Sequence, residues 1–182
     1  ARALGRRLIT VLQGCEAVVV PSAGCSAHLR DYGRLFADEP AWAARAARLA
    51  DLSVDLVAYL DRHAQDLRFL PDRRRVAYHP PCHHTHAQGL RQEPLRLLDR
   101  VPGVERVEVE DAEVCCGSAG SYSLFHPRRA RAARAEKMER LSRNGPELVL
   151  TANPGCELFL DAGFVEAGGG PAVEHLAVYL AR

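Results

Sequence analysis

A strand–turn–helix unit that occurs twice constrains the fold of this chain more than any other feature. The run Glu16–Cys25 (EAVVVPSAGC) aligns with Glu147–Cys156 (ELVLTANPGC) at an offset of 131 residues. Each copy has an apolar run, then a turn that contains proline and glycine, then a cysteine where a helix is expected to start. A repeated strand–helix unit of this kind predicts an α/β fold with parallel strands flanked by helices.

The repeat predicts two related units, one partial and one complete. Residues 1–70 are expected to be the C-terminal half of a first unit, and residues 76–182 a complete second unit, with a polar linker around 64–75. Two copies of one unit suggest a pseudo-twofold arrangement. Helices are expected over 1–13, 25–36, 40–63, 94–100, 128–143, 157–161 and 172–181, and strands over 16–21, 76–79, 104–109 and 147–151.

Composition narrows the class of protein. Hydrophobic residues make up 47% and charged residues 26% of the 182, a balance typical of a globular domain. A formal net charge of +1 argues against a nucleic-acid binder, which normally carries a basic excess. No apolar run approaches the ~20 residues of a bilayer span, and no secretory signal is present, so we expect a cytoplasmic protein. The chain does not begin with Met, which suggests a piece of something longer.

Four of the six cysteines follow predicted strands or adjoin them. They are Cys82, Cys115, Cys116 and Cys156, and Cys15 and Cys25 lie in the partial unit. In a reducing compartment, cysteines bind metal or perform redox chemistry more often than they form disulfides. Because the carboxyl ends of parallel strands share one edge of a sheet, we expect the four thiols to meet there. Four thiolates are the ligand set of an iron–sulfur cluster, whereas adjacent cysteines are awkward for a tetrahedral structural zinc site.

The residues beside these cysteines fit a ligand role. Gly117 and Gly155 allow the backbone to come close to inorganic sulfide, and neighbouring N–H groups can donate to sulfur. Ser118 could also donate a hydrogen bond. Cys82 has four histidines around it: His79, His83, His84 and His86. They could ligate zinc or form a polar loop at the edge of the site, and the polar loop is favoured because four thiolates already satisfy a cluster. We also expect His79 and His83 to donate N–H groups to the cluster.

The motifs together resemble a known family. Cys82, Cys115-Cys116-Gly117 and Asn153-Pro154-Gly155-Cys156 are similar to the CCG cysteine-rich domain found in heterodisulfide reductases and in hydroxy-acid dehydrogenase iron–sulfur subunits. The context Tyr78-His79-Pro80-Pro81-Cys82 most resembles the glycolate oxidase (glycolate dehydrogenase) iron–sulfur subunit. The resemblance implies a redox subunit that holds an iron–sulfur cluster, with 4Fe-4S expected, and Cys25 as part of a second site.

The resemblance also implies partners. A flavin-containing subunit would oxidise the 2-hydroxy acid, and this subunit would pass electrons toward a quinone or another acceptor, at the inner face of the membrane through the complex. The chain departs from the full family motif because Phe159 stands where a final cysteine is expected. Two alternatives therefore stay open: a zinc- or cluster-stabilised interaction module, and a heterodisulfide reductase-like thiol redox subunit.

Overall fold

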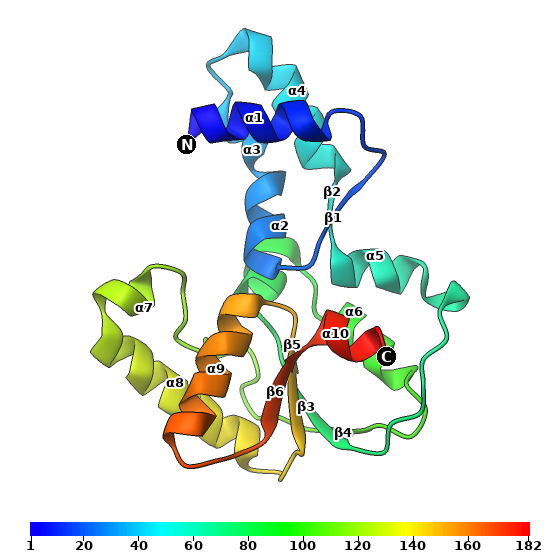
Figure 1. Ribbon diagram of the computed structural model, residues 1–182, viewed down its shortest axis with the longest axis vertical. Coiled ribbons are helices and arrows are strands. Elements are labelled where there is room, and N and C mark those ends of the chain that lie inside the picture. The colour runs from blue at the N-terminus through cyan, green and yellow to red at the C-terminus, as the bar shows by residue number, and fades with distance from the viewer.

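The structure is a computed structural model that describes residues 1–182. Figure 1 shows two parts: an N-terminal part of mostly helices above a C-terminal part built on a sheet. The N-terminal part holds α1 (Arg2–Leu12), β1 (Val18–Val20), α2 (Ala23–Arg30), α3 (Tyr32–Leu35), α4 (Pro40–Leu52), β2 (Ser53–Asp55), α5 (Leu56–Arg62) and the 3₁₀ turn η1 (Ala64–Asp66). Strands β1 and β2 form a two-stranded parallel sheet.

The C-terminal part is an α/β layer structure. Its elements are β3 (Arg75–His79), the short π-helix η2 (His83–Gln88), α6 (Glu93–Asp99), β4 (Glu105–Val107), α7 (Tyr122–Phe125), α8 (Pro127–Ser142), β5 (Leu148–Thr151), α9 (Pro154–Glu166), β6 (Ala172–His175) and α10 (Leu176–Leu180). All four strands are parallel, in the order β4-β3-β5-β6. The predicted α/β class with parallel sheets flanked by helices is confirmed.

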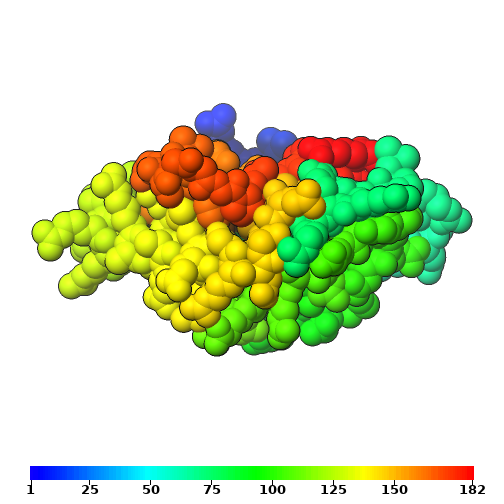
Figure 2. All heavy atoms as spheres, turned by 90° about the horizontal axis from the view of Figure 1, so that it is seen from below, coloured from blue at the N-terminus to red at the C-terminus, as the bar shows by residue number.

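The sheet has an apolar layer on each face. Because side chains alternate along a strand, Val76 and Leu150 pack with α6 and α10 on one face, while Ala77 and Val149 pack with α8 and α9 on the other. Burial on both faces explains why β3 and β5 are runs of apolar residues rather than alternating ones. Cys116 and Cys156 belong to the second layer. Figure 2 shows the molecule from below, where the C-terminal part covers most of the view.

A third apolar cluster joins α1, α3 and α4. Ile9, Tyr32, Phe36, Ala46 and Leu49 are buried in it. Trp42 packs against Phe36 at a ring-centroid distance of 6.2 Å and so joins α4 to this cluster.

Two predicted helices are wrong because each contains a short strand. The expected helix over 40–63 is interrupted by β2, and the expected helix over 172–181 begins with β6. The Ser53 hydroxyl donates to the carbonyl of Leu49 where α4 ends. Asp55 then starts α5 by accepting a hydrogen bond from the Val57 N–H at 2.9 Å, and His175 Nδ1 does the same for Ala177 at 3.1 Å. Pairing with β1 and β5 extends these segments despite their helical spacing.

Other predicted boundaries differ less. The expected helix over 157–161 is longer, Pro154–Glu166, and the expected helix over 25–36 divides into α2 and α3 at Asp31. The element order strand–helix is the same for β1–α2 and β5–α9, and for β2–α5 and β6–α10. The pseudo-twofold relation and the domain boundaries at 70 and 76 stay predictions.

Candidate metal centre

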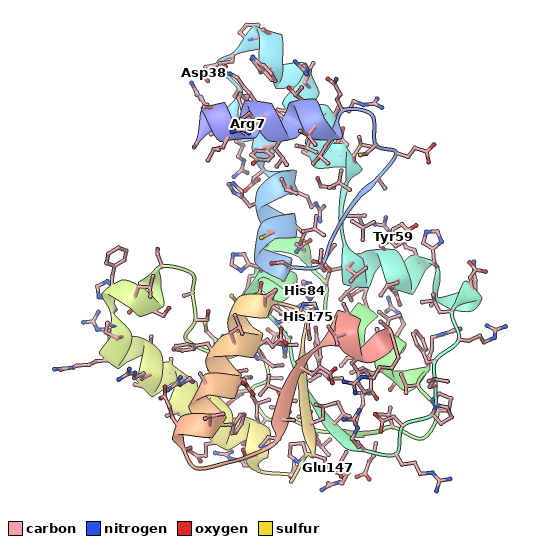
Figure 3. All side chains as sticks on the ribbon, viewed as in Figure 1. Arg7, Asp38, Tyr59, His84, Glu147 and His175 are labelled. Carbon is pink, nitrogen blue, oxygen red and sulfur yellow. The ribbon has the colours of Figure 1, made fainter.

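The ends of β3 and β5 position the site. His79, the last residue of β3, is paired in register with Thr151, the last residue of β5. Cys82 follows β3 after two prolines, and Cys156 lies in the first turn of α9 directly after β5. Glu147 marks the other end of β5, far from this edge, as Figure 3 shows. The two cysteines therefore lie at the carboxyl edge of the sheet, where ligands of parallel α/β proteins usually bind.

The Cys115-Cys116 pair reaches this edge on a loop that packs against α8. Gly117 has a φ of +86°, and a Cβ atom there would overlap the carbonyl oxygen of Ala130. Only glycine combines this backbone angle with so close an approach to a helix. The loop buries Cys116 beside Cys156, Ala77 and Val149. Gly117 therefore fixes how deeply the cysteine pair enters the site.

The structure brings the four predicted thiols together as a chain of neighbouring sulfurs, which we call the cysteine site (Cys82, Cys115, Cys116 and Cys156). Hydrogen bonds from Cys116 and Cys82 lower the pKa of Cys115. A hydrogen bond from Cys116 likewise lowers the pKa of Cys156, although burial opposes it. The pKa of Cys116 and the pKa of Cys82 are raised, in each case mainly by the hydrogen bond to Cys115. Each sulfur of the cysteine site therefore has another sulfur of the site as its hydrogen-bond neighbour.

Two further N–H groups donate to the thiolates. The Gly117 N–H lies 3.3 Å from Cys115 Sγ, and the Asn153 Nδ2 lies 3.4 Å from Cys156 Sγ. Such donors stabilise negative charge on sulfur. Cys156 is also in the first turn of α9, where the helix dipole favours an anion. The site is therefore built to hold thiolates, which are the form of cysteine that binds metal.

His79 belongs to the same site. Its side chain projects to the Ala77 face of β3, and its ligand atom lies within 4.8 Å of the sulfurs of Cys116 and Cys156. The imidazole is only 1% exposed, and its hydrogen bond with Cys156 helps to lower the pKa of that thiol. The donor set of cysteine sulfurs plus one buried imidazole therefore fits a thiolate-bound metal or cluster.

The remaining predicted residues lie around this centre. A Cβ on Gly155 would be 3.1 Å from Ser118 Oγ, so Ser118 lies over the start of α9. His83 is exposed, with Nδ1 3.7 Å from Cys82 Sγ, and His86 is exposed too. The favoured polar-loop interpretation is wrong for His79 and His84, which are both buried. It describes His83 and His86 well.

Cys25 does not join the cysteine site. It is exposed in the first turn of α2, the place that corresponds to Cys156 in α9. The two helix starts abut: the Ala23 N–H donates to the Ala152 carbonyl at 3.2 Å, and the Gly24 N–H donates to Asn153 Oδ1 at 3.3 Å. The role of Cys25 in a second site stays a prediction. Cys15 is partly buried near the end of α1, away from both the cysteine site and Cys25.

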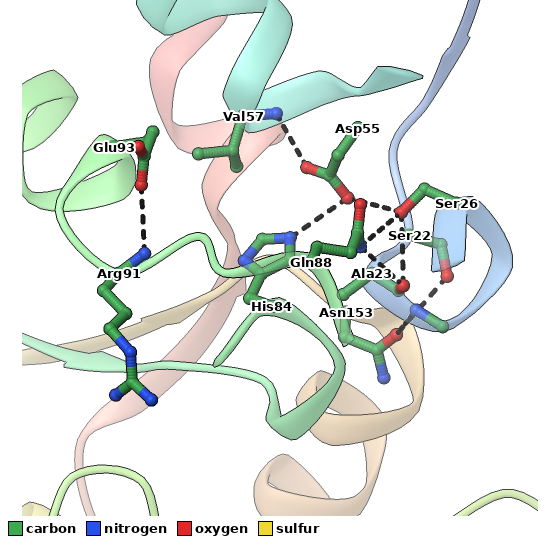
Figure 4. A network of polar contacts seen from close by, with 11 residues as sticks. Ser22, Ala23, Ser26, Asp55, Val57, His84, Gln88, Arg91, Glu93 and Asn153 are labelled. Atoms are coloured by element: carbon green, nitrogen blue, oxygen red, sulfur yellow. Dashed lines mark hydrogen bonds and ion pairs between the residues drawn. The ribbon is translucent and has the colours of Figure 1, made fainter. Parts of the chain in front are cut away.

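A buried polar network joins α2 and β2 of the N-terminal part to η2, the short helix that directly follows Cys82 in the chain (Figure 4). Asp55, at the end of β2, accepts a hydrogen bond from Ser26 at 2.7 Å, and its Oδ2 lies 3.0 Å from His84 Nε2. Gln88 donates to Ser26 at 2.8 Å. Asp55 and His84 are 3% and 0% exposed. This network fixes η2, and with it the backbone that carries Cys82, against the N-terminal part.

Sequence reasoning missed Asp55 and Asn153 as residues that hold the site. A signal for Asn153 existed, because it aligns with Ser22 across the repeat, and these two residues meet at 3.3 Å. Asp55 aligns with His175 in the similar runs Asp55-Leu56-Val57-Ala58-Tyr59-Leu60 and His175-Leu176-Ala177-Val178-Tyr179-Leu180. Both residues cap the helix that follows.

Comparisons with known proteins identify the family of this chain. The CCG family model, described as a cysteine-rich domain, matches residues 76–161. The chain is 30% identical over 177 residues to lactate utilization protein A of Bacillus subtilis, covering 96% of this chain and 74% of that protein. The chain belongs to the CCG cysteine-rich family. The predicted family resemblance is confirmed.

Two further relatives are much longer than the region that they share with this chain. The glycolate oxidase iron-sulfur subunit of Escherichia coli is 37% identical over 147 residues, which cover 81% of this chain and 36% of that protein. A probable glycolate oxidase iron-sulfur subunit of Bacillus subtilis is 36% identical over 168 residues, which cover 89% of this chain and 37% of that protein. The chain thus spans just over a third of the length of these relatives. None of its helices has the length and apolar character needed to cross a bilayer.

Proposed function

We propose that this CCG chain is an electron-transfer part of a hydroxy-acid oxidising complex and that its cysteine site holds an iron–sulfur cluster. The observation that carries the proposal is the set of four neighbouring sulfurs at one sheet edge, two of them lowered in pKa and supplied with N–H donors. Relatives whose names contain the words iron-sulfur subunit support it.

Each residue of the site has a distinct task in this proposal. Cys82, Cys115, Cys116 and Cys156 supply the four thiolate ligands that a 4Fe-4S cluster requires. Gly117 and Asn153 donate to sulfur, and His79 supplies a buried N–H or a ligand atom. When bound, the cluster supplies one-electron redox chemistry. The apolar layer of Ala77, Val149 and Leu160 excludes water from one side of the site.

The names of the relatives support the next part of the same proposal, the identity of the complex. Two relatives are named as glycolate oxidase iron-sulfur subunits and one as a lactate utilization protein. We therefore propose a 2-hydroxy acid, glycolate first, as the substrate of a flavin-containing partner subunit. Electrons would leave toward a quinone or another acceptor. The complex would lie in the cytoplasm, at the inner face of the membrane.

Zinc binding is the second candidate, and one observation favours it. His79, Cys116 and Cys156 place three ligand atoms within 4.8 Å of one another, a compact arrangement that suits a single ion. The protein would then be a metal-stabilised interaction module. The thiol redox alternative has less support, because Phe159 occupies the place of a further thiol and its ring lies 4.7 Å from the Arg134 guanidinium.

Metal analysis separates these candidates. The purified protein is reconstituted anaerobically with iron and sulfide, and iron, sulfide and zinc are then measured per chain. The proposal predicts about four irons per chain, lost in Cys116→Ala and retained in the matched control Cys15→Ala. Stoichiometric zinc without iron uptake would favour the interaction module instead.

A further inference from the structure

Lys137 is the only lysine of the chain, and it is completely buried. It lies on the face of α8 that points inward, together with Ala130, Arg134 and Leu141. Ala130 touches the backbone of Gly117, and Leu141 shares the apolar layer with Cys116 and Cys156. The residues on either side of Lys137 on this face therefore contact the cysteine loop and the cysteine site.

The ammonium group of Lys137 has one oriented partner. Its Nζ donates to the carbonyl of Ala112 at 2.6 Å, in the segment that leads to Cys115. The other buried cation of α8, Arg134, pairs with Glu166, but no carboxylate lies within 4.0 Å of Lys137. A buried cation without an anion nearby is strongly unfavourable, so such residues are normally paired.

The negative charge that acts on Lys137 comes from the cysteine site. Burial lowers the pKa of Lys137 to about 8, while the negative charges of Cys116, Cys115 and Cys156 act in the opposite direction. Arg140 on the next turn adds a positive charge but is itself paired with Glu136 and Asp111. Lys137 is thus close enough for the charge of the cysteine site to act on its pKa, and that negative charge would increase when metal-bound thiolates replace thiols.

We propose that the Lys137 ammonium group is the counter-charge of the cysteine site, and that it raises the reduction potential of the cluster bound there. The inference rests on the proposed function. Reduction adds one electron to the site, supplied in the test by dithionite, while Lys137 keeps its proton and no bond forms. A fixed buried positive charge stabilises the more negative reduced state, because little solvent screens the interaction. Lys137 is therefore a positioning and tuning residue rather than a ligand.

The test measures the midpoint potential of the reconstituted full chain. In Lys137→Met, which removes the charge but keeps the length, the equilibrium constant for reduction is expected to fall at least tenfold, or about 59 mV for one electron. Lys137→Arg keeps the charge and should stay within threefold of the wild type. The matched control is Arg128→Gln, which removes an exposed charge from the same helix and should also stay within threefold. A Lys137→Met potential equal to that of Arg128→Gln would overturn the inference.

A structural role for Lys137 is separated by a fourth variant. Lys137→Gln keeps a hydrogen-bond donor for Ala112 without the charge, so a counter-charge role predicts a lowered potential in this variant as well. If the uncharged variants hold no iron but Lys137→Arg does, the counter-charge role is supported through cluster retention. Loss of iron in all three Lys137 variants, Met, Gln and Arg, would indicate that Lys137 serves packing alone and would contradict the counter-charge role. Failure of the wild type to bind iron would overturn the proposed function, whereas iron uptake with unshifted potentials would overturn only this inference.

Discussion

Replacing Gly117 with alanine should destabilise the protein without touching any cysteine. At φ +86° a Cβ costs about 1–2 kcal/mol, because L residues avoid the left-handed region. The same Cβ would overlap the carbonyl oxygen of Ala130 and lie 3.2 Å from the Cβ of Ala133. Forcing an extra carbon into a packed contact costs about 1–3 kcal/mol. The total loss in the free energy of unfolding is then about 2–5 kcal/mol, which lowers Tm by about 4–20 °C for a chain of this size.

Gly120→Ala is the matched control for this prediction. Gly120 has a φ of +57° in the same loop region, but nothing lies within 4 Å of a Cβ built there. Gly120→Ala should lower the free energy of unfolding only by the cost of the backbone angle, about 1–2 kcal/mol. Urea unfolding of the reduced, metal-free protein, followed by circular dichroism, measures both variants. Equal stability of Gly117→Ala and Gly120→Ala would refute the idea that contact with α8 sets the position of the cysteine pair.

Two further perturbations test how the N-terminal part supports the site. Asp55→Ala removes the buried acceptor of His84, Ser26 and the Val57 N–H and should cost about 1–3 kcal/mol of unfolding free energy, measured by urea unfolding. Burial would raise the pKa of Asp55, but hydrogen bonds from His84, Ser26 and the Val57 N–H together lower it. Its stabilisation is therefore complete above an ordinary carboxyl pKa of about 3.9 and is lost as the pH falls through the lower folded value. Acid unfolding should be less steep in Asp55→Ala than in the wild type. Asn153→Ala leaves the Gly24 N–H without its acceptor and should cost about 1–3 kcal/mol; unchanged stability would show that the junction is held elsewhere.

The main strands and the cysteine site could be predicted because their signals are local. Apolar runs identify β3 and β5, and parallel strands place the residues that follow them at one edge, which brings Cys82 and Cys156 together. The strands β2 and β6 could not be found from periodicity. Each is three or four residues long and runs directly into a helix, and only pairing with β1 or β5 reveals it.

The supporting residues were missed for a different reason. Lys137 belongs to an Arg-rich helix. Because charged helix faces are usually solvated, nothing local indicates that this one cation points inward. Burial of Lys137, Asp55 and His84 depends on contacts between segments far apart in the chain. In hindsight, a single lysine among 24 basic residues and the two aligned helix starts at Asp55 and His175 were the available clues.

Electron paramagnetic resonance of the reconstituted chain tests the central claim most directly, because it reports whether the cysteine site accepts an electron. Spectra are recorded before and after anaerobic reduction with dithionite. The account predicts a signal that appears on reduction, is lost in Cys156→Ala and persists in Cys15→Ala. A wild-type protein that is spectroscopically silent in both states and carries one zinc would contradict it.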